Sequence, residues 1–347
     1  MRDDFNVNRV MLGGKIDPLS EIRNAGIVTN GSVFWVRPET SADYTTFQAQ
    51  VGIQNTFGTI QSAIDKTRDD KNDYVLITVP DSNAVYTLGT ALDINKDRIH
   101  VIGVGYNRVA ENYAVTLRGF ATTAAGTPVD SEMVNVTGGG VEFAGIRVFG
   151  TSGTSAGGTV TNGFVRIGTS SDGTAHDFWM HDAVVEAGGG ITAIFGTPAL
   201  VMTPGTVHSA RFDNVSFLVP GNTGEKAHAG LVSLGAGGKR WRFNDCLFLH
   251  NGGSTADRFV TTGTGAKEFT LFKNTTFVEV GTVAMASAFV GSVTVGNPVI
   301  SQGHVVVGTV TQLGTDPNVY KSPVASGTST AVRDYGIAIG TAALLPA

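Results

Sequence analysis

Five acidic residues lie in or beside a recurring sequence pattern and are the side chains best suited to chemistry. Asp182 and Asp245 take the same place in two copies of the pattern, and the others are Asp213, Glu186 and Glu279. Hydrolysis of a glycosidic bond needs two carboxyl groups about 5–9.5 Å apart. The acids are otherwise sparse, and backbone geometry explains the two at the recurring position. We therefore predict that no residue of the chain is catalytic.

Histidines are the second group considered, because imidazole is both a base and a metal ligand. His176 and His181 each precede an aspartate, but residues five apart do not share one side of a helix or strand. A zinc site needs three or four ligands. We expect solvated loop histidines, with no metal site and no cofactor, while Ser-His-Asp chemistry stays open. The seven histidines are His100, His176, His181, His208, His228, His250 and His304.

A glycine-rich, basic segment, GAGGKR at 235–240, is the third candidate. A phosphate-binding P-loop ends in G-K-[ST] and leads into a helix. Here a strand pattern follows, so the glycines are interpreted as a turn. Strand alternation places Trp241 and Phe243 inward, with Arg240 and Arg242 outward. The net charge of −5 gives no reason to expect nucleic-acid binding.

These residues belong to an internal repeat. Three segments align without gaps: 199–217, 230–248 and 259–277. Phe212, Phe243 and Phe272 correspond in them, and Leu200, Leu231 and Val260 lie at one shared position further upstream. A repeat of about 30 residues is typical of solenoids, whose copies stack to bury a shared core. We predict that the three phenylalanines stack.

Two positions after the aromatic residue, each copy carries Gly, Asn or Asp. These residues tolerate a left-handed backbone, and apolar or small residues follow at alternate positions. The pattern predicts a strand, a one-residue corner and a second strand, with the corner residues stacked from coil to coil. The predicted corner ladder is Gly145, Asp182, Asn214, Asp245 and Asn274.

The composition favours an all-β chain with many turns. There are 46 Gly residues, and 15 % of residues are charged where about 25 % is typical. The single cysteine, Cys246, excludes an internal disulfide. The sequence has no signal peptide and no apolar run long enough to span a membrane, so we expect synthesis in the host cytoplasm and no membrane partner.

One segment has helical periodicity. Ile60, Ala63, Ile64 and Thr67 are spaced i, i+3, i+4 and i+7, which predicts a helix at about 59–68. Before it, VFWVRP at 33–38 alternates like a strand, and from Tyr74 short strands alternate with turns. The order predicts an N-terminal arm (1–30), a β domain (31–310) and a C-terminal arm (311–347).

The order of segments in this chain resembles the pectate-lyase-like right-handed parallel β-helix superfamily. The segments are FWVRP, FGTIQSAID, YVLITVP and DRIHVIGVG, followed by copies of the pattern φ-x-x-N/D-φ-x-φ, in which φ is an apolar residue. The resemblance covers roughly residues 31–300. It implies an all-β right-handed parallel β-helix (a solenoid), with the helix at 59–68 capping the first coil. Among proteins that share this pattern, those without a signal peptide are commonly bacteriophage tailspikes, fibres and capsid-associated proteins. The resemblance therefore implies a bacteriophage protein.

The resulting hypothesis is a non-enzymatic structural protein of a bacteriophage virion, most specifically a capsid decoration (cement) protein. The expected partners are copies of the chain, as a homotrimer, and other virion proteins such as the major capsid protein. Nucleic acid and membranes are not expected partners. The alternative is a tailspike or fibre that binds or cleaves host surface polysaccharide.

The segment 335–347, YGIAIGTAALLPA, carries no charge. Apolar segments of this kind favour contact with protein over water, either with other subunits or with the body of the same chain. We favour contact with other subunits. Deleting 335–347 is therefore expected to weaken assembly or attachment to particles and to leave the far-ultraviolet circular dichroism unchanged. A truncated protein that assembles normally, measured by light scattering and by co-sedimentation with particles, would contradict this expectation.

Overall fold

The structure is a computed structural model. The described residues are 31–78, 84–104, 115–119, 132–150, 163–169, 175–187, 200–219, 231–234, 239–250, 259–262, 270–279, 289–291, 299–302, 305–308, 319–321 and 331–333. The predicted arm at 1–30, the segment 335–347, His228 and His304 lie outside them. In the described part, no helix is long and apolar enough to cross a membrane.

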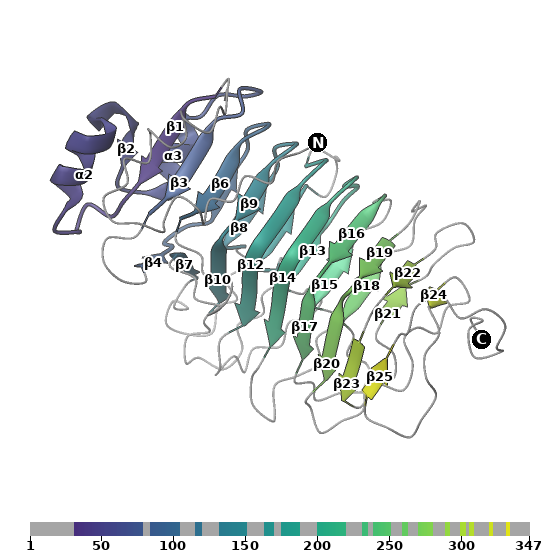
Figure 1. Cartoon of the computed structure of the whole chain (residues 1–347). Helices are drawn as coiled ribbons and strands as arrows, with labels where there is room; N and C mark the ends of the chain where they lie inside the picture. The colour runs from purple at the N-terminus through teal and green to yellow at the C-terminus, as the bar shows by residue number, and fades with distance from the viewer. Residues whose placement is uncertain are drawn as a thin grey trace, which may run out of the picture.

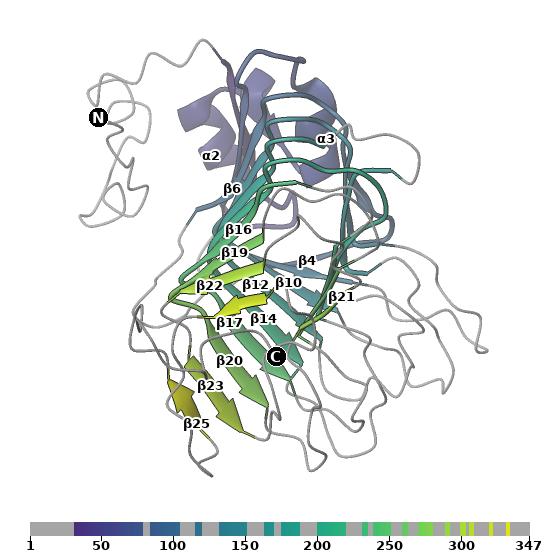
Figure 2. The same ribbon diagram turned by 90° about the vertical axis from the view of Figure 1, so that its right-hand side faces the viewer.

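The described chain is mostly β-structure, with a large sheet of 18 strands and a smaller one of seven (Figure 1). Strands far apart in sequence pair in parallel, and the described exception is the antiparallel pair of β23 and β25. Each turn of the chain runs through two halves of the large sheet and then through the small sheet. The halves and the small sheet lie on different sides of one apolar core (Figure 2).

Each half of the large sheet, and the small sheet, is a row of strands that follow one another along the stack. The first half of the large sheet contains β2 (Thr56–Phe57), β1 (Val33–Val36), β3 (Tyr74–Ile77), β6 (His100–Gly103), β9 (Glu142–Ala144), β12 (Trp179–Ala187), β14 (Arg211–Val219), β16 (Trp241–Asn244), β19 (Thr270–Lys273), β22 (Val299–Gln302) and β24 (Val319–Lys321). The second half contains β4 (Ala84–Thr87), β7 (Val115–Arg118), β10 (Ile146–Gly150), the continuing β12 and β14, β17 (Leu247–His250), β20 (Thr276–Glu279), β23 (Val305–Gly308) and β25 (Ala331–Arg333). The small sheet contains β5 (Leu92–Ile94), β8 (Val134–Val136), β11 (Val165–Ile167), β13 (Val201–Thr203), β15 (Val232–Leu234), β18 (Val260–Thr262) and β21 (Phe289–Gly291).

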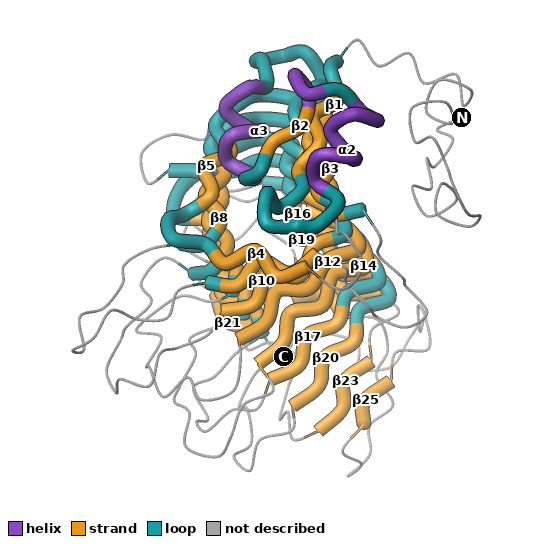
Figure 3. The backbone as a smooth tube through the Cα atoms, turned by 90° about the vertical axis from the view of Figure 1, so that its left-hand side faces the viewer, coloured by secondary structure: helices purple, strands orange, loops and turns teal. Residues whose placement is uncertain are grey.

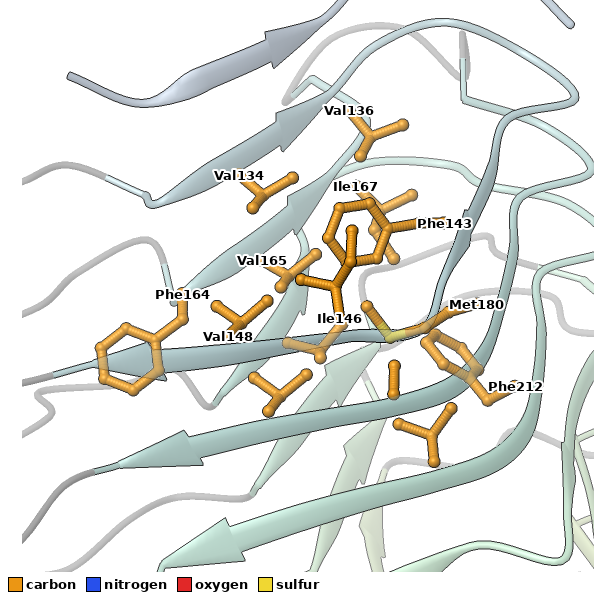
Figure 4. Close-up of a cluster of buried hydrophobic side chains, with 14 of the residues drawn as sticks. Val134, Val136, Phe143, Ile146, Val148, Phe164, Val165, Ile167, Met180 and Phe212 are labelled. Atoms are coloured by element: carbon orange, nitrogen blue, oxygen red, sulfur yellow. The ribbon is translucent and has the colours of Figure 1, made fainter. Parts of the chain in front are cut away.

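Aromatic side chains stack along the core. Phe212 pairs with Phe243, and Phe243 pairs with Phe272, in adjacent parallel strands. The ring centroids are 4.8 Å apart at both steps, with interplanar angles of 4° and 10°. The spacing equals the distance between hydrogen-bonded strands, so register alone brings the rings together. Upstream, Phe143 and Met180 continue the same column (Figure 4).

The large sheet bends at a column of residues with a left-handed backbone. The φ angles are +67° at Gly145, +48° at Asp182, +54° at Asn214, +53° at Asp245 and +50° at Asn274. At each bend the side chains on both flanks point inward. The pattern of Gly, Asn and Asp thus coincides with the bend in all five copies.

A second left-handed column precedes the first half of the sheet, and the sequence interpretation missed it. Its members have little in common as residue types, which is why no pattern revealed them. Their φ angles lie between +54° and +65°, and they are Asp70, Arg98, Gly140, Asp177, Ser209 and Arg240. Each of the first five donates its backbone N–H to the following coil, as in the bond from Ser209 to the Lys239 carbonyl, 2.7 Å.

Helix α3 (Ile60–Lys66) lies at the predicted place. Thr59 caps it by accepting the Ser62 N–H at 3.2 Å, and Ile60, Ala63 and Ile64 are buried in the main core. The side-chain amide of Gln61 accepts the backbone N–H of Asp93 (2.9 Å) and donates to its carbonyl (3.2 Å). Asp93 belongs to β5, the first described strand of the small sheet, so the amide satisfies backbone groups that the edge of a sheet exposes.

Helix α2 (Tyr44–Val51), followed by the 3₁₀ turn Ile53–Asn55, was not predicted. Its apolar residues Tyr44, Phe47 and Val51 have the spacing i, i+3 and i+7, but the helix is short and has no side-chain cap. Phe47 packs on Trp35 of β1 with ring centroids 5.9 Å apart. The two helices lie at the same end of the stack, on different sides (Figure 3).

The stacked sheet includes β1 and β2 at its start, and its strands β24 and β25 lie within 311–347. One predicted correspondence needs correction. Val260 pairs with Val232, so it does not correspond to Leu231. The cause is one extra residue between Val260 and Phe272 compared with the preceding repeat.

The phenylalanine column generates a stability prediction. Phe243 is fully buried between two other rings, so Phe243→Ala leaves a large cavity and is expected to lower the free energy of unfolding by about 3–5 kcal/mol. Urea denaturation followed by circular dichroism measures the change. The control Arg242→Ala removes an exposed neighbour and is expected to change it by less than about 0.5 kcal/mol. Equal effects of the two substitutions would contradict the assigned core.

Candidate functional site

The structure does not gather the acids that the sequence singled out. Asp182 and Asp245 lie at the bend, where each accepts the amide N–H of the asparagine one coil on. Asn214 donates to Asp182 at 2.6 Å, and Asn274 donates to Asp245 at 3.2 Å. These bonds join the side chains of corner residues in adjacent coils. Both carboxylates therefore serve the corner ladder.

The other acids have separate partners. Glu186 on β12 accepts two hydrogen bonds from Arg147 on β10, at 2.7 and 3.1 Å. Glu279 on β20 points into the core and pairs with His250 on β17, 2.7 Å from Oε2 to Nδ1. Both side chains of that second pair are buried, which contradicts the expectation of a solvated His250. Loss of either partner would leave a buried polar group without this hydrogen bond, which is destabilising.

The most connected titratable group lies on the outer face of the first half of the sheet, around Glu142. One carboxylate oxygen of Glu142 is hydrogen-bonded to Nδ1 of His100. The other accepts a hydrogen bond from Nε2 of His181, with 2.7 Å between the two atoms. The second ring nitrogen of His181 faces Asp182 at 3.0 Å. The imidazole of His181 thus lies between two carboxylates, which is the geometry of a doubly protonated, charged ring.

The pKa values follow from this packing. Burial alone would raise the pKa of Glu142, but hydrogen bonds and charges from His100 and His181 lower it to about 2. Burial alone would lower the pKa of His181, but its bonds to Asp182 and Glu142 raise it to about 9. Both groups therefore stay charged near neutral pH. A general acid or base works best with a pKa near the operating pH, so neither group is poised for proton transfer.

Beside this cluster, Trp179 and Asp213 form a second one. The indole N–H of Trp179 donates to Asp213 at 2.7 Å, and Arg211 forms an ion pair with the same carboxylate at 2.5 Å. Asn244 donates to its other oxygen at 2.6 Å. The Trp179 ring stacks on His181 at 4.1 Å, and the guanidinium of Arg211 lies 5.4 Å from its centroid. The polar groups are thus bonded mainly to one another.

Sequence reasoning missed this face, because Glu142 is 42 residues from His100 and 39 from His181. One signal could have revealed it. Glu142, Trp179, Arg211 and Arg242 each lie three positions before a corner residue, so the repeat alignment already places them in one row across the sheet.

His176 and His208 form a stacked pair on the turn before the first half, with centroids 4.6 Å apart. The backbone N–H of His208 donates to Nδ1 of His176 at 3.0 Å, so this contact ties two coils together. His100 and His181 lie on strands, which corrects the expectation that the histidines occupy solvated loops. Among the described residues, no group of three or more His, Cys, Asp or Glu has the arrangement of a metal site.

The remaining candidates add no reactive group to the described region. Trp241 and Phe243 are buried while Arg240 and Arg242 are exposed, so the basic segment is an ordinary strand. Cys246 is buried, and burial raises the pKa of its thiol, which keeps the thiol protonated. A match to the G-x-S-x-G serine motif, GTSAG at 153–157, lies outside the described residues together with 235–238.

Fold and site together define a mostly β protein with a large parallel sheet and a self-bonded polar face. No family model and no curated protein matches the chain. Among solved structures it is similar to ORF18 of Geobacillus virus E2, with 11 % identity and a TM-score of 0.26 over 85 % of this chain and 65 % of that one. It is also similar to PfbA, a surface adhesin of Streptococcus pneumoniae, with 9 % identity and a TM-score of 0.22 over 90 % and 93 % of the two chains. Scores this low do not define a shared fold.

The clustered charges predict a pH dependence of stability. The folded pKa of His181, about 9, exceeds the unfolded value of 6.5, so its contribution is complete below about pH 6.5 and is lost as the pH rises through 9. Glu142 acts in the opposite direction, and its contribution is lost as the pH falls from about 4.5 through 2. His181→Gln should reduce the drop in unfolding free energy between pH 6 and 9.5 by on the order of 2 kcal/mol. An unchanged drop, measured by urea denaturation at both pH values, would show that His181 is not held charged by these carboxylates.

Proposed function

We propose that the protein is a non-enzymatic structural component of a bacteriophage virion, most specifically a capsid decoration protein. In this proposal the chain is a right-handed parallel β-helix of the pectate-lyase-like type. It assembles as a homotrimer on other virion proteins, such as the major capsid protein. The virion assignment is based on the resemblance described from the sequence and on the repetitive scaffold.

The observation that carries the non-enzymatic part is the state of the outer-face acids. Glu142 and Asp213 each accept hydrogen bonds from two or more neighbouring side chains, and the pKa of Glu142 is about 2. A glycosidase needs one carboxyl group that stays protonated and a second one facing it across the substrate. Glu142 and Asp213 instead tie one coil to the next, which is what a rigid scaffold requires.

The location of the protein in whole particles tests this function. Heads and tails of particles that contain the chain are separated and analysed by quantitative mass spectrometry. The proposal expects the chain in heads, at a fixed ratio to the major capsid protein. Its absence from particles would overturn the virion assignment, and its presence in tails alone would overturn the decoration assignment.

Absence of catalysis is a separate prediction. Asp182→Asn and Asp245→Asn keep a residue that tolerates the left-handed backbone and keep an oxygen that accepts the asparagine amide. Asp245→Asn is expected to change the free energy of unfolding by less than about 1 kcal/mol, whereas Asp182→Asn also removes a charged partner of His181 and is expected to lower it further at neutral pH. Both substitutions are expected to leave particle attachment intact. Release of reducing ends or unsaturated sugars from host polysaccharide, abolished by either substitution, would show that the protein is an enzyme.

A tailspike or fibre that binds host polysaccharide is the second candidate. One observation favours it: Arg211 and Arg242 are exposed and pair in adjacent strands, and Arg211 lies next to Trp179. Arginine and tryptophan are enriched in binding surfaces. Purified protein would be tested for binding to host surface polysaccharide, with the double substitution Arg211→Glu and Arg242→Glu as comparison. Binding that the double substitution abolishes would favour this candidate over decoration.

A further inference from the structure

A series of hydrogen bonds from side chains to backbone runs along the turns that precede the first half of the large sheet. In three coils, the side chain one position before the left-handed residue of the second column accepts the backbone N–H of its counterpart one coil on. Asp69 accepts from Asp97 at 3.2 Å, and Asp97 accepts from Gly139 at 2.8 Å. Further along, Nδ1 of His176 accepts from His208 at 3.0 Å. Two aspartates and one imidazole thus have the same role in one column.

The two kinds of acceptor work over different ranges of pH. A carboxylate accepts hydrogen bonds down to about pH 4, whereas an imidazole takes up its second proton near pH 6.5 in ordinary surroundings. The Nδ1 atom of His176 accepts the His208 N–H only while it carries no proton, so the proton of the neutral ring is on Nε2. The bond that joins these two coils is therefore present only in the neutral form of His176.

The ring of His208 also favours the neutral form. The two imidazoles are stacked in parallel, with centroids 4.6 Å apart and an angle of 5° between the ring planes. Two protonated rings at this separation repel each other. Both residues are half-buried, so solvent and salt screen the repulsion less than they would on an open surface.

Among the described residues, no carboxylate contacts the ring of His176. On the same turn Asp177 is exposed, and His176 forms no ion pair in the described part of the chain. The preceding turn has glycines at 138–140, and the turn of the second coil on has Lys239 and Arg240. The charged residues at the corresponding positions of all these turns are Asp69, Asp70, Asp97, Arg98, Asp177, Lys239 and Arg240. Protonation of His176 therefore adds a charge that no contacting carboxylate neutralises.

We propose that the stacked pair of His176 and His208 is an acid-sensitive joint between two coils. Above about pH 6.5 the neutral ring of His176 holds the amide of His208, and its contribution to stability is complete. As the pH falls below this value, protonation removes the bond and adds repulsion, so the turn opens. Beyond the turn β12 and β14 stay paired at seven positions, which confines the opening to the turn. The inference goes beyond the proposed structural function and does not depend on it.

The test is amide hydrogen exchange of the purified full chain, followed by mass spectrometry at pH 7.5 and pH 5.5 and corrected for the intrinsic rate at each pH. Protection of the turn at 207–210 is expected to fall on the order of tenfold between the two values, as for one lost hydrogen bond. The turn at 96–98, where Asp69 accepts the Asp97 amide, is the internal control and should keep its protection. The circular dichroism spectrum should be the same at both values.

Two substitutions separate the joint from the other histidines. His176→Asp introduces the residue that has this role at positions 69 and 97, so the bond is kept and the fall in protection should disappear. His176→Phe keeps an aromatic ring but removes the acceptor, so protection of the turn should be low at both values. His181 stays protonated throughout this range, because its pKa is about 9, and so does not cause the change.

Equal protection of the wild-type turn at pH 7.5 and pH 5.5 would overturn the proposal. So would a His176→Asp protein that keeps the full fall in protection, or a His176→Phe turn as protected as the wild-type turn at pH 7.5. Loss of β-structure at pH 5.5 would contradict an opening confined to the turn. Because these measurements use isolated protein, their outcome is independent of whether the chain is found in particles.

Discussion

The backbone ladder between parallel strands is the interaction on which the rest of the molecule depends. Strand β14 is hydrogen-bonded to β12 on one side and to β16 and β17 on the other, and those partners belong to the neighbouring coils. Because each rung fixes which residue faces which, the ladder alone decides that Phe212 lies on Phe243 and that Asp182 meets Asn214. The segments between paired strands differ in length from one coil to the next, while the strands keep the same register.

Register also determines the character of each surface. Along a strand, alternate side chains point into the core and to the outside. The bend at Asn214 lets the residues on both sides of it in β14 keep this alternation and bury their inner side chains. Outside the bend the two flanks differ: one carries Arg211 and Asp213, and the other carries Ser216 and Leu218. A polar, internally bonded face and an uncharged face therefore arise from a single strand. The charged groups of the first face pair with one another, whereas the outward residues of β14 on the second face carry no charge.

Local sequence was sufficient to predict some of these features. Asn, Asp and Gly at the bend have a direct conformational meaning, and the helix at Ile60 has both apolar spacing and a capping threonine. The second left-handed column could not be found in this way, because Ser209 and Arg240 are not residues that favour this backbone. The cluster around Glu142 required knowledge of which residues pair across about 40 positions, and Val260 was misplaced because one added residue shifted the register. Non-local pairing, rather than propensity, was the missing information.

The varying length of the repeats has a geometric meaning for the whole molecule. Successive aligned phenylalanines are 31 and then 29 residues apart, yet each step advances the stack by the same ring separation of 4.8 Å. The length of the stack therefore depends on the number of coils and not on the number of residues in each coil. Gain or loss of one complete coil would change the length of the stack by about 4.8 Å and leave both ends as they are. An insertion within a loop would instead widen the molecule and leave its length the same.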